Sequence, residues 1–150
     1  MNDCFVNGII AGIGAGIIQN LLNFISYGLH FTKLRYLDYA SIFLYGNYPT
    51  IWIETIFAQL AQLIFNGFLG IIFAMLVPLI KKDYLLLKGW YYGTSVWFII
   101  NSIGALYKVP SLLHNTWQTV FSNFLTSSVY GLLLAYLIWR LENSKAKVLK

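Results

Sequence analysis

The most constraining feature of this chain is the length of its uncharged stretches. Its 150 residues include only ten basic and five acidic ones, and these leave four long gaps without charge. The gaps run from Asp3 to Lys33, from Glu54 to Lys81, from Lys88 to Lys108 and from Lys108 to Arg140. A run of about 20 apolar residues is enough to cross the hydrocarbon core of a bilayer. The spacing of the charges therefore predicts an integral membrane protein with four spans.

The predicted fold is all-α, a four-helix transmembrane bundle forming a single domain over residues 1–150. We expect spans at about residues 5–27, 50–80, 89–107 and 117–140, followed by a short charged cytoplasmic tail at 141–150. The segment 34–46 is too short to cross a bilayer, and its tyrosines favour the headgroup region, so it is predicted to be a short interfacial or re-entrant helix. A β-barrel is disfavoured, because Leu69–Leu76 shows no alternation of apolar and polar residues.

Composition excludes several other classes. With 59% hydrophobic and 10% charged residues, the chain lacks the polar side chains needed to cover a soluble domain. The net charge of +5 is explained by basic residues beside the spans, so the bilayer is the expected partner and no nucleic acid is expected. The single cysteine, Cys4, excludes an internal disulfide and a multi-cysteine metal site.

The distribution of lysine and arginine predicts the orientation. With four spans, both termini and the loop between the second and third spans share one side of the membrane. That side carries Lys81, Lys82, Lys88, Arg140, Lys145, Lys147 and Lys150, whereas the other carries Lys33, Arg35 and Lys108. Because basic residues are enriched in cytoplasmic loops, we expect a multi-pass protein of the inner (cell) membrane with both termini in the cytoplasm.

Small residues at every fourth position form a stripe on each predicted span. Such stripes let helix backbones approach closely in a bilayer, where apolar burial alone does not drive association. The glycines expected to pack helices are Gly8, Gly12, Gly16, Gly70, Gly89, Gly93 and Gly131. They predict a compact bundle, and they leave open a homo-oligomer or a membrane-protein partner that docks on the same stripes.

The two halves of the chain can be aligned without gaps inside the spans. The second span falls on the fourth at an offset of 64, which matches Gly67 with Gly131, and the first falls on the third at an offset of 81. The second offset matches Gly8 with Gly89 and Gly12 with Gly93. Either the chain is a duplicated hairpin with parallel repeats, or apolar helices resemble one another by composition.

Polar side chains recur inside the predicted spans at similar depths in the outer half of the bilayer. The candidate vestibule residues are Gln19, Asn20, Asn23, Glu54, Gln59, Gln62, Asn101, Gln118, Ser122, Asn123 and Thr126. One interpretation is hydrogen bonding between helices. The other is a polar vestibule, open outward, that binds or passes a small solute. Asn66 lies deeper and is predicted to be a separate contact, and Trp97 is predicted to be a packing residue.

Glu54 is the only acidic residue within a predicted span. Its position about one turn into the helix suits the positive helix N-terminus, and the alternative is a cation or proton site. His30, His114, Asp38 and Glu54 lack metal-site spacing, so no metal site is predicted. No nucleophile, phosphate-loop or metalloprotease motif occurs, so we expect no enzyme activity and no cofactor.

Four stretches carry a resemblance to a known group of proteins. They are Gly8–Gly12, Leu34–Asp38, Glu54–Gln59 and the pair Gly89-Trp90. The whole chain resembles the small four-span inner-membrane proteins of Gram-positive bacteria that have no assigned activity. The resemblance implies the fold alone.

The sequence leads to two hypotheses of function. The first is a small transporter or channel-like protein with an outward-facing polar vestibule. The alternative is a non-transporting membrane subunit, for assembly or sensing, that acts through contacts between helices.

Overall fold

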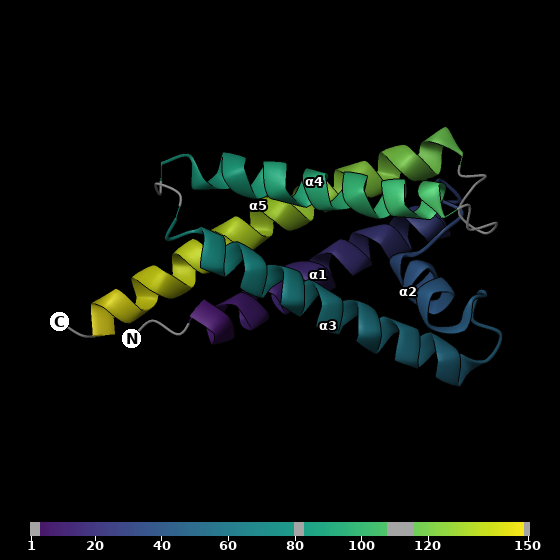
Figure 1. Ribbon diagram of the computed structural model, residues 1–150, viewed down its shortest axis with the longest axis horizontal. Coiled ribbons are helices and arrows are strands. Elements are labelled where there is room, and N and C mark those ends of the chain that lie inside the picture. Colours follow the sequence, from purple (N-terminus) through teal and green to yellow (C-terminus); the bar gives the residue numbers. More distant parts are fainter. Residues whose placement is uncertain (1–3, 80–82, 108–115, 149–150) are drawn as a thin grey trace.

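The computed structural model describes residues 4–79, 83–107 and 116–148, with side chains as far as residue 144, and folds them into five helices (Figure 1). The helices are α1 (Cys4–Gly28), α2 (Tyr36–Tyr45), α3 (Trp52–Leu76), α4 (Leu85–Leu106) and α5 (Trp117–Val148). The fold is all-α, as predicted. The basic residues Lys81, Lys82, Lys108 and Lys150, together with His114, lie outside the described residues.

Three helices are long and apolar enough to cross a membrane. They are Cys4–Gly28, Trp52–Leu76 and the part of α5 from Trp117 to Ser144. The remaining predicted span, at 89–107, corresponds to α4, which has 22 residues but carries Lys88 and several tryptophan, tyrosine and other polar residues. These residues lower its hydropathy, so the crossing of α4 stays a prediction.

The exposure of side chains is the reverse of that in a soluble bundle. Large apolar side chains lie on the outside of the long helices, with Ile64 70% exposed and Phe98 64% exposed. Amide side chains instead lie inside, with Asn23 1% exposed and Asn123 2% exposed. An apolar exterior suits lipid tails, and buried amides can bond to one another across helices. The described part of the chain is thus built as a helical membrane protein.

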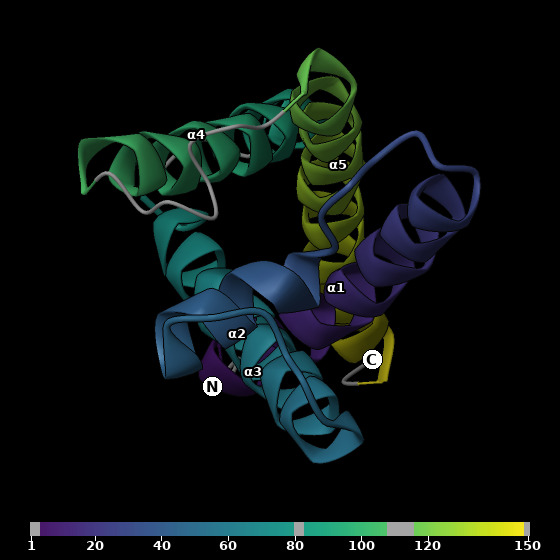
Figure 2. The same ribbon diagram turned by 90° about the vertical axis from the view of Figure 1, so that its right-hand side faces the viewer.

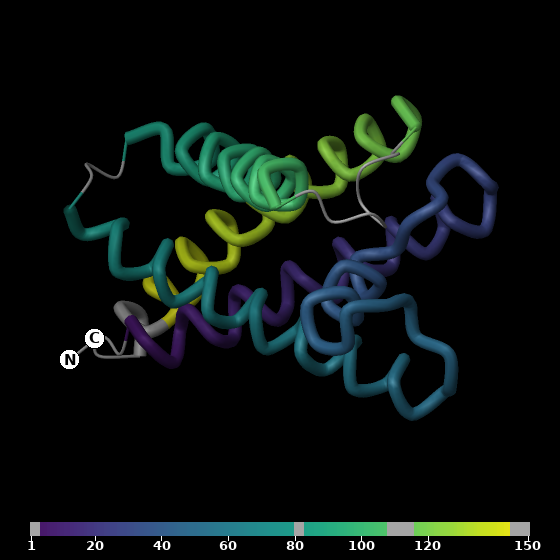
Figure 3. Tube along the Cα trace, turned by 45° about the vertical axis from the view of Figure 1, so that its right-hand side comes forward, coloured from purple at the N-terminus to yellow at the C-terminus, as the bar shows by residue number. Residues whose placement is uncertain are grey.

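The long helices run alternately up and down, so that both termini lie at one end (Figure 1, Figure 3). The end of α3 and the start of α4 lie at this terminal end, and α2 lies at the opposite end. Helix α3 stops at Leu76, just before Pro78, as expected of a proline that cannot continue a helix. Helix α5 continues beyond the predicted span end at residue 140 and through most of the predicted tail, because no glycine or proline interrupts it before Val148.

Glycines bring the helices together in two antiparallel pairs. In the first pair, a Cβ added to Gly8 would lie 2.6 Å from the backbone of Ile71, and one on Gly12 would lie 3.0 Å from that of Gly67. In the second pair, a Cβ added to Gly93 would lie 2.9 Å from the backbone of Gly131. The predicted stripes therefore pack α1 on α3 and α4 on α5 within the chain.

The two pairs share one register. A Cβ added to Gly89 would lie 2.5 Å from that of Ala135, and the contact of Gly93 with Gly131 repeats that of Gly12 with Gly67. Adding 81 to the residue numbers of α1 and 64 to those of α3 converts the contacts between α1 and α3 into those between α4 and α5. The contacts of the two pairs therefore follow the register that the two offsets predict.

The two helix pairs do not pack symmetrically. If the two hairpins were related by exact symmetry, α4 would pack on α3 in the way that α1 packs on α5. Helices α1 and α5 are among the extensively packed pairs, whereas α3 and α4 are not. Helices α3 and α4 meet near the terminal end, where the rings of Phe73 and Tyr92 lie 5.0 Å apart, and they diverge towards α2 (Figure 1, Figure 2).

The apolar core lies towards the terminal end of the bundle. Its most buried large side chains are Phe73, Val77, Leu134 and Ile138. Beyond this core, towards α2, the interior becomes polar. The core therefore closes the terminal end of the space that separates α3 from α4.

Candidate functional site

Amides and hydroxyls from three helices meet in the interior, and we call this set the polar band. It consists of Gln19, Asn20 and Asn23 on α1, Gln62 on α3, and Ser122, Asn123, Thr126 and Ser127 on α5, all buried. Asn20 Nδ2 donates to Gln62 Oε1 over 2.6 Å, and Gln19 Nε2 donates to Ser127 Oγ over 3.5 Å. Seven of the eleven predicted vestibule residues belong to this band.

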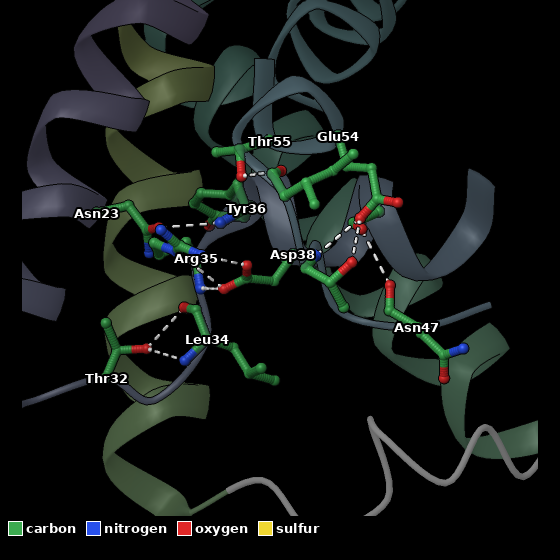
Figure 4. A network of polar contacts seen from close by, with 12 residues as sticks. Asn23, Thr32, Leu34, Arg35, Tyr36, Asp38, Asn47, Glu54 and Thr55 are labelled. Atoms are coloured by element: carbon green, nitrogen blue, oxygen red, sulfur yellow. Dashed lines mark hydrogen bonds and ion pairs between the residues drawn. The ribbon is translucent and has the colours of Figure 1, made fainter. Parts of the chain in front are cut away.

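The hydroxyl of Tyr36 extends the polar band from α2. It donates to the backbone oxygen of Asn123 over 2.9 Å and lies 2.7 Å from Thr126 Oγ1 and 2.9 Å from Ser127 Oγ. The backbone N–H of Tyr36 donates to Asn23 Oδ1 over 3.0 Å (Figure 4). Burial raises the pKa of the Tyr36 phenol above its usual value, so it remains a neutral donor. Tyrosines here were expected at the headgroup level, and the sequence did not indicate that one would reach α5.

An ion pair fixes the start of α2. Arg35 donates from Nε and Nη2 to the two carboxylate oxygens of Asp38 over 3.1 and 2.8 Å, and its backbone N–H donates to Asp38 Oδ2 over 2.7 Å (Figure 4). Hydrogen bonding to Asp38 raises the pKa of Arg35 above its usual value. The guanidinium also lies 5.1 Å from the ring centre of Tyr27 on α1. These contacts hold α2 against the end of α1, next to the polar band.

Four predicted vestibule residues lie outside the polar band. Glu54, in the first turn of α3, accepts hydrogen bonds from the backbone N–H and hydroxyl of Thr50 over 2.7 and 3.0 Å, just before the helix begins. Gln118 lies half-buried in the first turn of α5. Gln59 donates to Gln62 over 3.3 Å at the edge of the polar band. The fourth, Asn101, bonds to its own helix through the backbone oxygen of Trp97, over 2.8 Å.

A cavity of about 410 Å³ lies beside the polar band, where α3 and α4 diverge. Helix α2 covers one end with Tyr36, Tyr39, Ala40, Phe43 and Leu44. The remaining walls come from all four long helices. They are formed by Gln19, Ala61, Gln62, Phe65, Asn66, Leu69, Gly93, Val96, Trp97, Ile100, Asn101, Ile103, Asn123, Ser127 and Tyr130. The volume falls within the range of small-molecule sites, which is about 300–1,000 Å³.

Three polar atoms from residues that line this cavity have no hydrogen-bond partner. They are Gln19 Oε1, Asn66 Nδ2 and Trp97 Nε1. Gln19 is 5% exposed and Asn66 is 4% exposed, so neither side chain can reach bulk solvent. Each unsatisfied buried donor or acceptor costs about 1–3 kcal/mol. All three atoms are closed to solvent within their own packing, and the Asn66 side chain lies against Gly16 of α1.

The Trp97 ring packs edge-on against Phe124, with ring centres 5.3 Å apart, as expected of a packing residue. The unpartnered indole N–H was not foreseen. The sequence could indicate that Trp97 lies at membrane depth but not that the neighbouring helix turns away from it.

In the part of the chain that the structure describes, no three His, Cys, Asp or Glu side chains lie close enough together to hold a metal ion. The cavity walls carry amides, hydroxyls, aromatic rings and apolar side chains, and no carboxylate, amine, guanidinium or imidazole. Such a lining suits binding by hydrogen bonds and apolar contact.

Comparison of the chain with known protein families, curated proteins and solved structures finds no significant match.

Proposed function

We propose that this chain is a multi-pass membrane protein that binds a small molecule inside its helix bundle, in the cavity between α2, α3, α4 and α5. The observation that carries the proposal is a cavity of about 410 Å³ whose walls combine apolar side chains with amides from all four long helices. A purely structural bundle would be more stable with this space filled by larger side chains, because an unfilled cavity forgoes packing contacts.

Filling the cavity tests this proposal. Val96 lines the cavity, whereas Ile99 on the same helix is 54% exposed on the outside. Intact protein, Val96→Trp and the matched control Ile99→Trp are purified in mild detergent, extracted with organic solvent and compared by mass spectrometry. The proposal expects one molecule in near-stoichiometric amount with the intact protein and Ile99→Trp, and its depletion with Val96→Trp. Identical extracts from all three proteins would contradict it.

We also propose that α4 is a fourth span, in an inner-membrane protein with both termini in the cytoplasm. Support comes from the common end occupied by the termini and the start of α4, and from the excess of basic residues predicted for that side. The resemblance to small four-span inner-membrane proteins of Gram-positive bacteria leads to the same proposal.

Transport of the bound molecule is a second candidate function, favoured by the place of α2. Helix α2 covers the cavity and bonds to the polar band through Tyr36 and Tyr39, at the end away from the termini. If α2 moved away, the polar band would be open towards that end and would become the predicted vestibule. The unequal packing of the two repeats also fits a bundle whose halves can rock against each other.

Accessibility of Ser127 separates transport from binding alone. Ser127 lines the cavity behind α2 and is 5% exposed. In a Cys4→Ser background, Ser127→Cys in intact cells is treated with a membrane-impermeant thiol reagent, with Tyr48→Cys as the exposed control. Transport requires slow but complete labelling of Ser127→Cys. Labelling of Tyr48→Cys alone would favour the non-transporting, sensory alternative.

The structure bears on how a non-transporting subunit could contact its partner. Docking of a partner on the glycine stripes was the expected mode, but these stripes already pack α1 on α3 and α4 on α5. A sensory or assembly subunit would therefore act through another surface. Crosslinking in native membranes would detect its partner.

A further inference from the structure

We infer that the cavity takes a hydrocarbon chain, and that the chain enters sideways from the bilayer between α3 and α4. The inference rests on the proposed binding function and names the chemical class of the ligand. The chain belongs either to a membrane lipid or to a free hydrocarbon dissolved in the bilayer, and the test below distinguishes these two sources.

One side of the cavity is not closed by helix packing. Around the cavity, α2 packs on α3, α3 on α1, α1 on α5 and α5 on α4. In the part of the chain that the structure describes, α4 packs extensively on neither α3 nor α2, and Figure 2 shows it turned away from both. We call this side of the cavity the α3–α4 seam.

Both ends of the cavity are covered. Helix α2 lies across the end away from the termini, where the Tyr36 hydroxyl donates to the backbone oxygen of Asn123. At the terminal end, the apolar core around Phe73 closes the space, and the Tyr92 hydroxyl joins α4 to α3 by donating to the backbone oxygen of Leu69 over 2.7 Å. A ligand from water on either side would have to displace one of these covers. A ligand from the bilayer can pass through the α3–α4 seam without displacing either.

The edges of the α3–α4 seam are apolar. Four residues that line the cavity are also exposed, namely Phe43, Leu44, Phe65 and Ile103, at 57%, 53%, 43% and 38%. Phe65 is the fourteenth of the 25 residues of α3, so the seam reaches the middle of a helix that is long enough to cross a membrane. An apolar edge at that depth faces lipid tails. The ligand therefore arrives from the lipid phase.

The polar side chains in the cavity walls bond mainly to other protein groups. Asn123 bonds to Asn23 and Tyr39 through the two ends of its amide. Gln62 Oε1 accepts from Asn20. The surface left for a ligand is formed mostly by apolar and aromatic side chains, and among the described residues that line it there is no lysine, arginine, histidine, aspartate or glutamate. Such a surface favours hydrocarbon and gives a charged group no counter-charge.

The cavity is elongated along the helices. Its wall on α4 extends from Gly93 to Ile103, and its wall on α3 extends from Ala61 to Leu69. At about 1.5 Å per residue, these walls are about 12–15 Å long. Spanning helices and lipid chains both run across the membrane, so a chain can lie along these walls while the rest of its molecule stays in the bilayer.

Contact quenching by bromine tests the ligand class. Bromine quenches tryptophan fluorescence on contact, and Trp97 lines the cavity. The other four tryptophans are replaced by phenylalanine, and the protein in nanodiscs is titrated with bromododecane, a hydrocarbon chain, or with bromopropanol, a small polar solute. The expected result is saturable quenching by bromododecane, at a membrane concentration at least about tenfold below that required by bromopropanol, whose hydroxyl would lose its hydrogen bonds. Dodecane without bromine should reverse the quenching.

A cavity-filling variant and a matched control locate the site. Val96→Phe fills the cavity and should remove the saturable quenching, whereas Ile99→Phe, on the outside of the same helix, should keep it. Ile103→Phe narrows the α3–α4 seam and should slow quenching several-fold relative to Ile99→Phe in stopped-flow measurements. Equal rates in these two variants would contradict entry at the seam. If Val96→Phe does not fold, displacement of bromododecane by dodecane in the protein with an unaltered cavity decides the class.

A phospholipid with a brominated chain identifies the source of the ligand. Its headgroup stays at the membrane surface, so its chain reaches the cavity only through the side of the bundle. Saturable quenching of Trp97 that Val96→Phe removes would identify the chain of a membrane lipid as the occupant. Saturable quenching by bromododecane alone would identify a free hydrocarbon, which also reaches the cavity from the bilayer.

The outcomes separate the ligand class from the proposed function. If bromopropanol saturates at the lower concentration and Val96→Phe blocks it, the inferred class is wrong and binding in the cavity stands. If no probe saturates but the solvent extracts of intact protein and Val96→Trp differ, the class is also wrong and binding stands. If no probe saturates and the two extracts are the same, both proposals fail.

Discussion

Asn23 and Asn123 face each other across α1 and α5, with Asn23 Nδ2 donating to Asn123 Oδ1 over 3.3 Å, and both side chains are almost fully buried. Asn23 also accepts from the backbone of Tyr36, and Asn123 also donates to the hydroxyl of Tyr39 over 3.1 Å. One pair of amides thus joins α1, α5 and α2.

Asn123→Leu should therefore destabilise the bundle. The substitution removes the acceptor of Asn23 and the donor to Tyr39 from a buried site. Interhelical hydrogen bonds in membranes are worth about 0.6–1.7 kcal/mol each, so we expect a loss of about 1–3 kcal/mol. This loss of stability is measured by SDS-induced unfolding that is monitored by circular dichroism. Leu125→Ala on the outward face, where Leu125 is 46% exposed, should cost less, and an equal loss in both variants would refute the role of the amide pair.

The glycine contacts predict a sharp contrast between positions. A Cβ on Gly131 would lie 2.1 Å from the backbone oxygen of Gly89, and one on Gly12 would lie 2.3 Å from that of Asn66. Backbone cannot move aside as a side-chain tip can, so Gly131→Ala and Gly12→Ala should each cost more than about 2 kcal/mol or prevent folding. The measurements are thermal unfolding and yield of monodisperse protein.

Gly28 is the matched control for these glycines. Nothing lies within 4 Å of a Cβ added there, at the end of α1. Gly28→Ala should change stability by less than about 1 kcal/mol. A similar loss from Gly28→Ala and Gly131→Ala would show that backbone flexibility, not close packing, explains the glycines.

The helix bounds and the depth of the polar residues could be predicted from patterns within each helix. The helix bounds agree with the predicted spans to within a few residues at most ends, because charges, Pro78 and turn residues mark where an apolar helix must stop. The meeting of Gln19, Asn23 and Asn123 was also predictable, because up-and-down helices place residues of equal depth side by side. Whether α4 crosses the membrane stays a prediction.

Other features depend on how helices are placed relative to one another, and the sequence does not encode this in a local pattern. The cavity exists because α4 diverges from α3, and no periodicity within α4 reports that divergence. The tyrosines of α2 fit the general preference for headgroups, and only tertiary structure shows that Tyr36 reaches α5. Glu54 was grouped with the vestibule by depth, whereas its carboxylate turns back to Thr50 on the preceding turn.

Tyr36 makes the attachment of α2 sensitive to alkaline pH. Because burial raises the pKa of its phenol, neutral Tyr36 contributes stability that is complete below the unfolded-state pKa of about 10 and is lost as pH rises through the folded-state pKa. Tyr36→Phe should cost about 1 kcal/mol near neutral pH, since its hydroxyl bonds disappear. Raising the pH from 8 to 11 should destabilise intact protein more than Tyr36→Phe. Hydrogen exchange of the α2 amides in detergent measures both effects, and equal alkaline sensitivity of the two proteins would contradict the assignment.

The number of crossings can be decided at the two ends of α4. Tyr84 precedes α4 and is 81% exposed, and Tyr107 follows it and is 79% exposed, so cysteine is tolerated at both positions. If α4 spans the membrane and both termini are cytoplasmic, an impermeant thiol reagent applied to intact cells should label Tyr107→Cys and spare Tyr84→Cys, in a Cys4→Ser background. Lysis should expose both. Protection of both residues in intact cells would mean that α4 stays on the cytoplasmic side, and α5 would then have to carry the C-terminus outside. That arrangement would separate the two termini, which share one end of the bundle (Figure 1), so the labelling pattern tests the membrane topology and the packing of α4 on α5 together.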